Sequence, residues 1–395
     1  MDAFWLDWIN LALRWAHVIV GIAWIGTSFF FVWLDHSLER PESDAARDVG
    51  GEAWLVHGGG FYRMQKYGRV PGPTLARLHW FKWEAYSTWL TGIALLFVMY
   101  YLGAETYLVS AASPVGPLAG VAIGIGFLVG GWLLYDWLCK RAWAVDQVRL
   151  ALVGFGLLGL AAFALGEVFT GRGAYIHVGA MLGTIMAANV AMVIIPGQRQ
   201  LVAATAAGGS PDPAVGAKAK QRSLHNNYLT LPVVLIMISN HYPMTYAQQW
   251  GWAILLALVL IGALVRHFFN LRHVGRQALW IPPAAAAALL ALAFVAQPRV
   301  APSAGTVSFA QVEQVIADHC AACHATVPSY PGFDAPPGGI VLETAADIRR
   351  HAQAIYAQAV ASEAMPLGNV TEITAAERGV LARWLAEREA DGTGR

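Results

Sequence analysis

Long apolar runs alternate with short polar connections over the first three quarters of the chain. A helix needs about 20 mostly apolar residues to cross the roughly 30 Å of hydrocarbon in a bilayer. Eight runs approach that length, and they cover residues 11–34, 83–102, 117–138, 148–169, 175–195, 224–242, 247–269 and 278–295. The sixth is the least apolar because it contains Pro232, Asn226, Asn227 and Asn240. This pattern predicts an all-α, polytopic transmembrane bundle of about eight helices.

A different pattern follows the eighth run. Residues 298–307 are rich in Pro, Ala and Ser, which is typical of a linker. Beyond them, Ser308 and Gln311 have the spacing of a capping box at the start of a helix, and Thr374 and Glu377 have the same spacing near the end. The chain therefore divides into a transmembrane domain over 1–297, a linker over 298–307 and a small soluble domain over 308–395.

Composition supports a membrane location and narrows the partners. Hydrophobic residues make up 57% of the chain and charged residues only 13%, and the mean hydropathy is +0.48. Soluble domains have about 45–50% apolar residues. The net charge of +1 gives no reason to expect a nucleic-acid partner. Three cysteines are too few for a disulfide scaffold.

The positions of Lys and Arg predict the orientation. Cytoplasmic connections retain an excess of basic residues, and here every second connection is basic, whereas the connection between the fourth and fifth runs has only Arg172. The basic connections are then cytoplasmic. With an even number of spans, both termini are predicted to be periplasmic, in a multi-pass protein of the bacterial inner membrane.

The most specific motif lies near the end of the chain, in the sequence Cys320-Ala-Ala-Cys323-His324. Two cysteines at this spacing, followed at once by histidine, form the attachment signature of a c-type haem, with His324 as a ligand of the iron. The alternative is a redox dithiol. Met365, followed by Pro366, is placed to supply a second axial ligand. A His/Met pair fills both axial positions and raises the reduction potential, as suits an electron carrier.

The order of helix, haem motif, loop, Met-Pro and final helix resembles class I cytochrome c. The resemblance covers about residues 308–388. It implies thioether bonds at Cys320 and Cys323, a proximal ligand at His324 and a distal ligand at Met365.

Five histidines fall within the apolar runs, and two of them, His17 and His177, are candidates for a role inside the bundle. Ionisable residues inside a membrane bundle are costly and mark functional hypotheses. His17 and His177 would be suitable ligands for a b-type haem held between two helices. They would otherwise line a substrate pocket, or be packing residues with ordinary hydrogen bonds.

The first basic connection combines glycines, aromatic residues and hydrogen-bond donors. His57 precedes three glycines, which let the backbone approach a ligand closely. Aromatic side chains nearby would stack on a flat heterocycle and polar ones would pair with its oxygens and nitrogens. The proposed substrate-binding residues are Phe61, Tyr62, Arg63, Gln65 and Lys82. The alternative is an interfacial segment whose aromatic residues anchor in the lipid headgroups.

Two stretches in this region also carry a family resemblance. The sequences VHGGGFYRMQKY and LHWFKWEAY, in an eight-helix bundle that ends in a cytochrome c domain, resemble the membrane-bound, cytochrome-c-linked urate oxidases of purine-degrading bacteria. The resemblance implies that urate and water give 5-hydroxyisourate. Electrons would pass through haem c to a respiratory-chain acceptor, either cytochrome c or a terminal oxidase, without hydrogen peroxide.

The residue roles at the urate site rest on this chain alone. Urate is flat, anionic and cytoplasmic, so we expect a pocket facing the cytoplasm. His79 is the first candidate for the general base that activates water, followed by His57 and His225. The competing hypothesis is a membrane-anchored electron-transfer cytochrome, linked to quinol or to transport. Eight helices, however, exceed what a tether requires.

Overall fold

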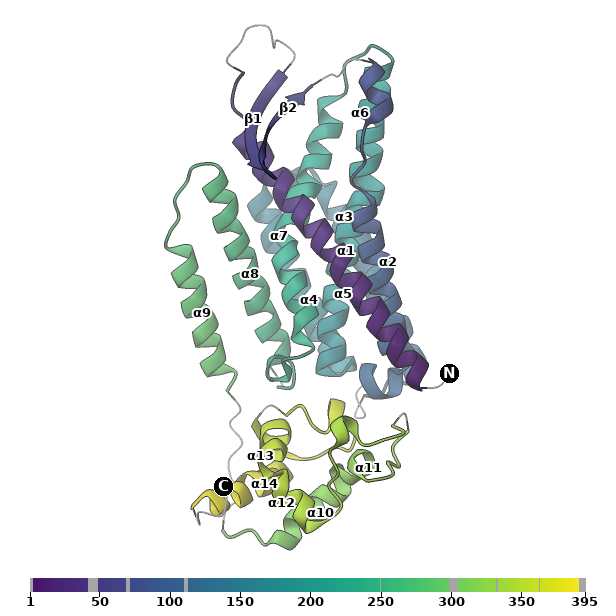
Figure 1. Ribbon diagram of the computed structural model, residues 1–395, viewed down its shortest axis with the longest axis vertical. Helices are drawn as coiled ribbons and strands as arrows, with labels where there is room; N and C mark the ends of the chain where they lie inside the picture. The colour runs from purple at the N-terminus through teal and green to yellow at the C-terminus, as the bar shows by residue number, and fades with distance from the viewer. Residues whose placement is uncertain are drawn as a thin grey trace.

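The computed structural model describes residues 3–41, 49–68, 72–109, 113–248, 250–297, 305–331, 333–361 and 363–390. It shows a long helical bundle with a β-hairpin at one end and a small helical domain against the other (Figure 1). We call these the hairpin end and the docked end. Successive segments of the bundle run in alternating directions, and the N-terminal helix begins at the docked end (Figure 1).

Each of the eight apolar runs contains a helix. The bundle consists of α1 (Ala3–Ser37), α2 (Trp83–Leu96), α3 (Pro117–Cys139), α4 (Gln147–Val168), α5 (Gly171–Ala188), α6 (Ile195–Ala206), α7 (Pro213–Ser239), α8 (Gly251–His273) and α9 (Ile281–Val295). Shorter helical segments join or extend them: η2 (Gly72–Arg77), η3 (Phe97–Tyr101), η4 (Ala104–Leu108), η5 (Ala142–Val145), η6 (Asn189–Ile194) and η7 (Pro243–Thr245). Through η6, α5 and α6 form one continuous rod.

Within the described residues, five helices are long and apolar enough to cross a membrane. They are Phe4–Ser37, Pro117–Cys139, Gln147–Val168, Gly171–Ala206 and Gly251–His273. α9 is apolar but has only 15 residues, and α7 begins with a polar stretch. The predicted number of about eight transmembrane helices therefore stays a prediction.

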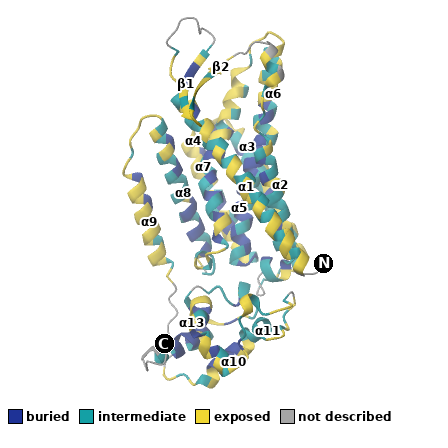
Figure 2. Ribbon diagram, in the orientation of Figure 1, coloured by how far each residue is buried: buried dark blue, intermediate teal, exposed yellow. Residues whose placement is uncertain are grey.

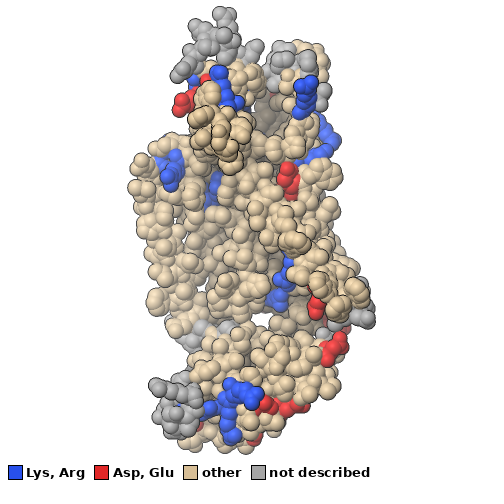
Figure 3. Space-filling view, in the orientation of Figure 1, with Lys and Arg blue, Asp and Glu red and all other residues tan. Residues whose placement is uncertain are grey.

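The outer surface of the bundle is apolar. Exposed side chains include Trp15 on α1 at 69%, Leu152 on α4 at 68% and Phe294 on α9 at 74%. Figure 2 shows exposed residues along the outside of α1 and α9, with buried residues inside. On the face drawn in Figure 3, charged side chains gather toward the two ends and the middle is mostly uncharged. Apolar surface of this extent is unusual on a soluble monomer.

Glycines allow the central helices to pack closely. A Cβ added to Gly124 of α3 would lie 2.6 Å from Nε2 of His177 on α5. The same kind of contact places Gly131 against Met181, and Gly179 against Ile236 of α7. Helix α5 is thereby held between α3 and α7, and most of its side chains are buried.

The connection after α1 corrects the all-α prediction. Strands β1 (Val49–His57) and β2 (Gly60–Tyr67) form an antiparallel hairpin in which His57 pairs with Gly60. Gly58 and Gly59 make the turn with φ of 57° and 80°, values that two-residue hairpin turns require and glycine readily adopts. The triple glycine therefore forms a turn rather than a flexible ligand-binding loop, and the flanking aromatic and β-branched residues favour strands.

The C-terminal domain is built from short helices around its own core. Its elements are α10 (Phe309–His319), α11 (Ala321–His324), η8 (Pro337–Gly339), α12 (Ala345–Arg350), α13 (Ala352–Ile355), η9 (Tyr356–Ala361), η10 (Leu367–Asn369) and α14 (Ala375–Ala390). Val312 and Ile316 of α10 pack with Leu381 of α14 in this core.

The capping boxes predicted for the first and last helices of this domain are confirmed. Ser308 and Gln311 bond reciprocally at the start of α10. At the start of α14, the Glu377 carboxylate accepts hydrogen bonds from the hydroxyl and the backbone of Thr374, both at 2.7 Å. These bonds stabilise the carboxylate and lower the pKa of Glu377 to about 2.

The α3–α5 contact predicts opposite effects on stability for Gly→Ala substitutions at two positions of α3. Gly124→Ala should destabilise the protein by about 1–3 kcal/mol, because the new methyl group would overlap the His177 ring. Gly126→Ala is the matched control, since a Cβ there meets nothing within 4 Å, and it should be neutral or stabilising by up to about 1 kcal/mol. Thermal unfolding of the two variants in the same detergent tests this. Equal melting temperatures would contradict the close packing.

Candidate functional site

The cysteine motif forms a single helical turn at the start of α11. The backbone N–H of Cys323 donates to Cys320 O at 3.2 Å, and that of His324 donates to the same oxygen at 2.9 Å. Neither cysteine forms a disulfide within the described residues. Burial raises the pKa of Cys320 to about 12. The turn places two thiols and an imidazole next to one another, as attachment of a haem at this motif requires.

The orientation of His324 fits the role of an iron ligand. Its Nδ1 lies 2.9 Å from the backbone oxygen of Ile340. A carbonyl only accepts hydrogen bonds, so Nδ1 carries the proton and Nε2 keeps its lone pair. A hydrogen bond of this kind fixes the ring and its tautomer in metal-ligating histidines.

The loop that carries Met365 is held by backbone contacts. The N–H of Met365 donates to Gln358 O at 2.9 Å, and its oxygen accepts from Arg378 at 2.8 Å. The Arg378 side chain is 5% exposed. His319, another imidazole near the motif, has Nε2 at 3.2 Å from the carboxylate of Glu377. The donor set of two thiols, a tautomer-fixed imidazole and an anchored thioether fits a c-type haem.

The loop after Met365 also forms the contact with the bundle. A Cβ on Gly368 would lie 3.1 Å from Cγ2 of Thr170 and 3.4 Å from the backbone oxygen of Thr106. Thr170 in turn donates to Tyr107 O at 2.9 Å and caps α5 through the N–H of Gly173. The segment next to the expected distal ligand therefore lies directly against the docked end of the bundle.

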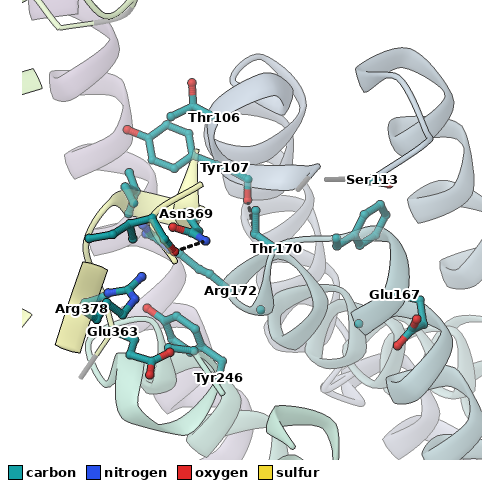
Figure 4. A pocket seen from close by; sticks show the side chains of 18 of the residues that line it. Thr106, Tyr107, Ser113, Glu167, Thr170, Arg172, Tyr246, Glu363, Asn369 and Arg378 are labelled. Carbon is teal, nitrogen blue, oxygen red and sulfur yellow. Dashed lines mark hydrogen bonds between the residues drawn. The ribbon is translucent and has the colours of Figure 1, made fainter. Parts of the chain in front are cut away.

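A cavity of about 420 Å³ lies at this junction. Residues of both domains line it, among them Tyr107, Thr170, Arg172, Tyr246, Glu363 and Asn369. In Figure 4, side chains from the bundle and from the C-terminal domain surround the same space. The cavity contains both acidic and basic groups, so it has no net preference for an anion.

A polar cluster within the bundle approaches this cavity. Arg172 donates to Tyr100 Oη at 3.0 Å and to Asn240 Oδ1 at 3.2 Å, and Tyr100 donates to the same Asn240 oxygen. Next to them, the His177 ring lies between Tyr101 and Phe169, with ring centroids 5.7 Å and 4.7 Å away. The docked end thus carries a cluster of aromatic and polar side chains next to the C-terminal domain.

His17 and His177 contact different helices. His17 Nδ1 lies 2.9 Å from the Thr91 hydroxyl of α2. His177 is fully buried, donates from Nδ1 to Gly173 O, and presents Nε2 to Gly124 of α3. Iron could reach that nitrogen only if α3 moved away from α5. The geometry therefore gives no support to a b-type haem shared by the two histidines.

The proposed substrate residues of the hairpin do not share one face. Side chains alternate across a strand, so Phe61, Arg63 and Gln65 project to one side and Tyr62 to the other. Arg63 and Gln65 both donate to Glu52, at 2.9 Å and 3.0 Å, while Phe61 is 82% exposed. Arg63 and Gln65 thus stabilise the hairpin through Glu52.

The three candidate bases lie in separate places. His57 is exposed at the hairpin turn, and His79 is exposed with its ring 4.6 Å from Phe81. The last substrate candidate, Lys82, precedes α2 with its ammonium 5.9 Å from the Trp83 ring. His225 lies on α7. In the described part of the chain, no hydrogen bond or ring contact joins these residues, and their catalytic roles stay predictions.

His225 belongs to a partly buried network that sequence reasoning missed. Its ring nitrogens lie 2.7 Å from Tyr135 Oη and 2.9 Å from Gln147 Oε1. Tyr135 accepts from Asn189, the first residue of the π-helical segment η6. Segments of this kind often occur at functional sites.

One turn earlier on α7, Arg222 forms a buried ion pair with Asp136 of α3 at 2.8 Å. It also donates to Asn189. This arginine is thus neutralised within the bundle.

A second buried cluster joins α7 to α8. Asn227 Oδ1 accepts from Arg266 Nε at 2.9 Å and from Asn270 Nδ2 at 3.0 Å. A sequence signal for it exists, because Arg266 and Asn270 are four residues apart and share one face of an otherwise apolar helix. By sequence alone, Asn227 is only one of the polar residues that make the sixth run the least apolar.

These observations define the class of protein. It is a large apolar helical bundle with buried charged and amide clusters, joined to a small helical domain that presents a Cys-X-X-Cys-His turn. Comparison with protein families adds the identity of the bundle: the chain belongs to the urate oxidase N-terminal family, which matches residues 3–297. No curated protein and no solved structure gives a significant match. Membership indicates an oxidoreductase that acts on urate.

The geometry of the motif predicts that two of the three cysteines attach haem covalently and that the third does not. Replacing Cys320 and Cys323 by Ser should abolish covalent haem, seen as loss of haem staining on a denaturing gel. Cys139→Ser is the matched control and should leave the staining unchanged, because Cys139 lies at the end of α3 in the bundle. Met365→Leu should retain the stain but lower the reduction potential, since a Met ligand raises it. Staining that survives the double variant would exclude haem attachment here.

Proposed function

We propose that the protein is a membrane-bound urate oxidase that delivers electrons to a fused c-type haem. Urate and water would give 5-hydroxyisourate, two protons and two electrons. A haem with two protein axial ligands supplies one-electron transfer and has no open position for substrate or dioxygen. The oxidation therefore belongs to the bundle, and hydrogen peroxide is not a product. The respiratory acceptor would reoxidise the haem after it receives the first electron and before it receives the second.

One observation carries this proposal. The family match covers the bundle from residue 3 to residue 297, and the part of the chain beyond it contains the Cys320–His324 turn. This arrangement supports urate chemistry and an electron carrier in one polypeptide. The contact of Gly368 with Thr170 supports transfer within the chain, because it brings the Met365 loop against the bundle.

The arrangement of the ends supports the predicted orientation. The N-terminus and the C-terminal domain both lie at the docked end (Figure 1). Lys66 and Arg63 lie on β2 at the hairpin end, and Lys140 and Arg141 follow α3 at that end. Basic residues favour the cytoplasmic side. We therefore place the docked end in the periplasm of a bacterial inner membrane, where c-type haems are attached.

The alternative of a simple membrane anchor for a cytochrome has less support. A tether needs one helix, and it has no use for a buried Arg222–Asp136 pair or a buried Arg266. Such groups are costly in an apolar bundle and mark functional regions.

Anaerobic urate should reduce the haem of the purified protein. Oxidised protein mixed with urate under argon should develop the absorption bands of reduced c-type haem, with two haems reduced per urate consumed, because each haem accepts one electron. In air, with an electron acceptor present, turnover should give no hydrogen peroxide. Bands that appear with a quinol but not with urate would favour the anchored electron carrier instead.

The docking contact predicts a second effect on electron transfer. Gly368→Leu should slow the reduction of haem by urate several-fold, because a side chain there would push the loop away from Thr170. Reduction by dithionite should remain fast. Gly339→Leu is the matched control, since Gly339 has a similar φ of 69° but a Cβ added there would meet nothing within 4 Å. Equal rates in the two variants would show that this contact is not on the electron route.

A further inference from the structure

The Asn227–Arg266–Asn270 cluster has hydrogen-bonding capacity left over. Among the described residues, five buried side-chain atoms have no hydrogen-bond partner, and three of them are Asn227 Nδ2, Arg266 Nη2 and Asn270 Oδ1. The three side chains are 0%, 2% and 8% exposed. An unpaired buried polar group costs about 1–3 kcal/mol, and a charged one more. Three such atoms on three residues joined through Asn227 Oδ1 indicate a site prepared for a ligand.

The amide orientations in this cluster are fixed by the guanidinium. Arg266 Nε can only donate, so Asn227 must turn its oxygen toward it. Asn270 then has to present its NH₂ group to that same oxygen. What remains is two donors, on Arg266 and Asn227, and one acceptor, on Asn270. This pattern matches the edge of a heterocycle in which carbonyl and N–H groups alternate.

Arg266 also lacks a neutralising partner. No carboxylate within the described residues forms an ion pair with it, whereas the other buried arginine of the bundle, Arg222, pairs with Asp136. The Phe29 ring of α1 lies over the guanidinium at 3.8 Å, which stabilises a cation only in part. A buried cation with amides on one side and an aromatic ring on the other favours a flat anion.

Basic residues lie between this cluster and the hairpin end of α8. Arg272 and His273 are the last two residues of α8, and His36 lies in the last turn of α1, which packs against α8. Asp35, the acidic neighbour of His36, is paired with Lys66 at 2.7 Å. Surfaces lined by one sign of charge concentrate ligands of the opposite charge. Arg266 lies seven residues, or about 10 Å, before the end of α8.

We propose that Asn227, Arg266 and Asn270 form the binding site for the anionic purine substrate, reached from the hairpin end past Arg272 and His273. The site rests on the proposed function and specifies where in the bundle the substrate is held. Arg266 would neutralise the anion, and the two asparagines would select the carbonyl and N–H edge of the ring.

Two measurements test the site separately from the reaction. Binding is measured as the rise in melting temperature that urate causes while ascorbate keeps the haem reduced, so that no oxidation occurs. Turnover is measured as urate-driven haem reduction. Arg266→Gln should raise KM roughly 10- to 100-fold, the equivalent of one lost charged hydrogen bond, and should remove the urate-induced rise. Asn270→Asp places an anion where the substrate anion binds, and should also exclude urate.

Two comparisons guard against a merely structural effect. Arg199→Gln, the same change at an exposed position of α6, should retain a urate-induced rise and change KM far less than Arg266→Gln. Without urate, Arg266→Gln should melt at or above the wild-type temperature, because it removes an uncompensated buried charge.

Each outcome is decisive. Wild-type KM and thermal shift in both site variants would overturn the site while the function stands. A urate-induced shift without haem reduction in the wild type would overturn the function while the site stands. If urate causes neither a thermal shift nor haem reduction in the wild type, both the site and the proposed function are wrong.

Discussion

The structure depends on one constraint: a polar group buried in an apolar bundle needs a partner, either from the bundle itself or from a ligand. Helix α7 is where this constraint is most severe, because its polar residues continue into the core. Asn226 meets this requirement by accepting from Asn189 and donating to Met186 O. These bonds tie α7 to the rod of α5 and α6 at the point where the π-helical segment η6 begins. The polar residues that weaken α7 as an apolar span thus specify its position.

The distance between the proposed substrate site and the proposed haem domain follows from the same architecture. Arg266 is fifteen residues from the start of α8, or about 22 Å along the helix from the docked end. The protein fills the docked end with aromatic rings: Tyr100, Tyr101 and Phe169 surround His177, and Tyr100 contacts Arg172 beside the interdomain cavity. This contiguous group lies between the core and the Met365 loop. His177 is better understood as a member of this group than as a ligand of a second haem.

Local sequence patterns predicted the parts of the structure that are locally determined. Apolar length placed a helix in each of eight runs, and Ser308 and Thr374 marked helix starts because capping involves residues only three apart. The hairpin was missed because glycines after His57 suit either a loop or a turn, and pairing with β2 decides between them.

The polar cluster was missed for a different reason. Asn227 and Arg266 are 39 residues apart and meet only through the packing of α7 on α8. Periodicity identifies the face of one helix, but it cannot identify the partner helix or show that a side chain will lack a counter-ion.

The contrast between the two buried arginines bears most directly on function. Asp136 neutralises Arg222, with Asn189 as an additional partner, so this arginine is complete and contributes to structure. Among the residues that the structure describes, Arg266 has only the neutral partners Asn227 and Phe29, and Asn270 bonds to the same Asn227 oxygen. An acid in place of either asparagine would have satisfied the charge within the chain. Amides orient the guanidinium without neutralising it, which leaves the charge available for an anion and maintains a site that is less stable empty than filled.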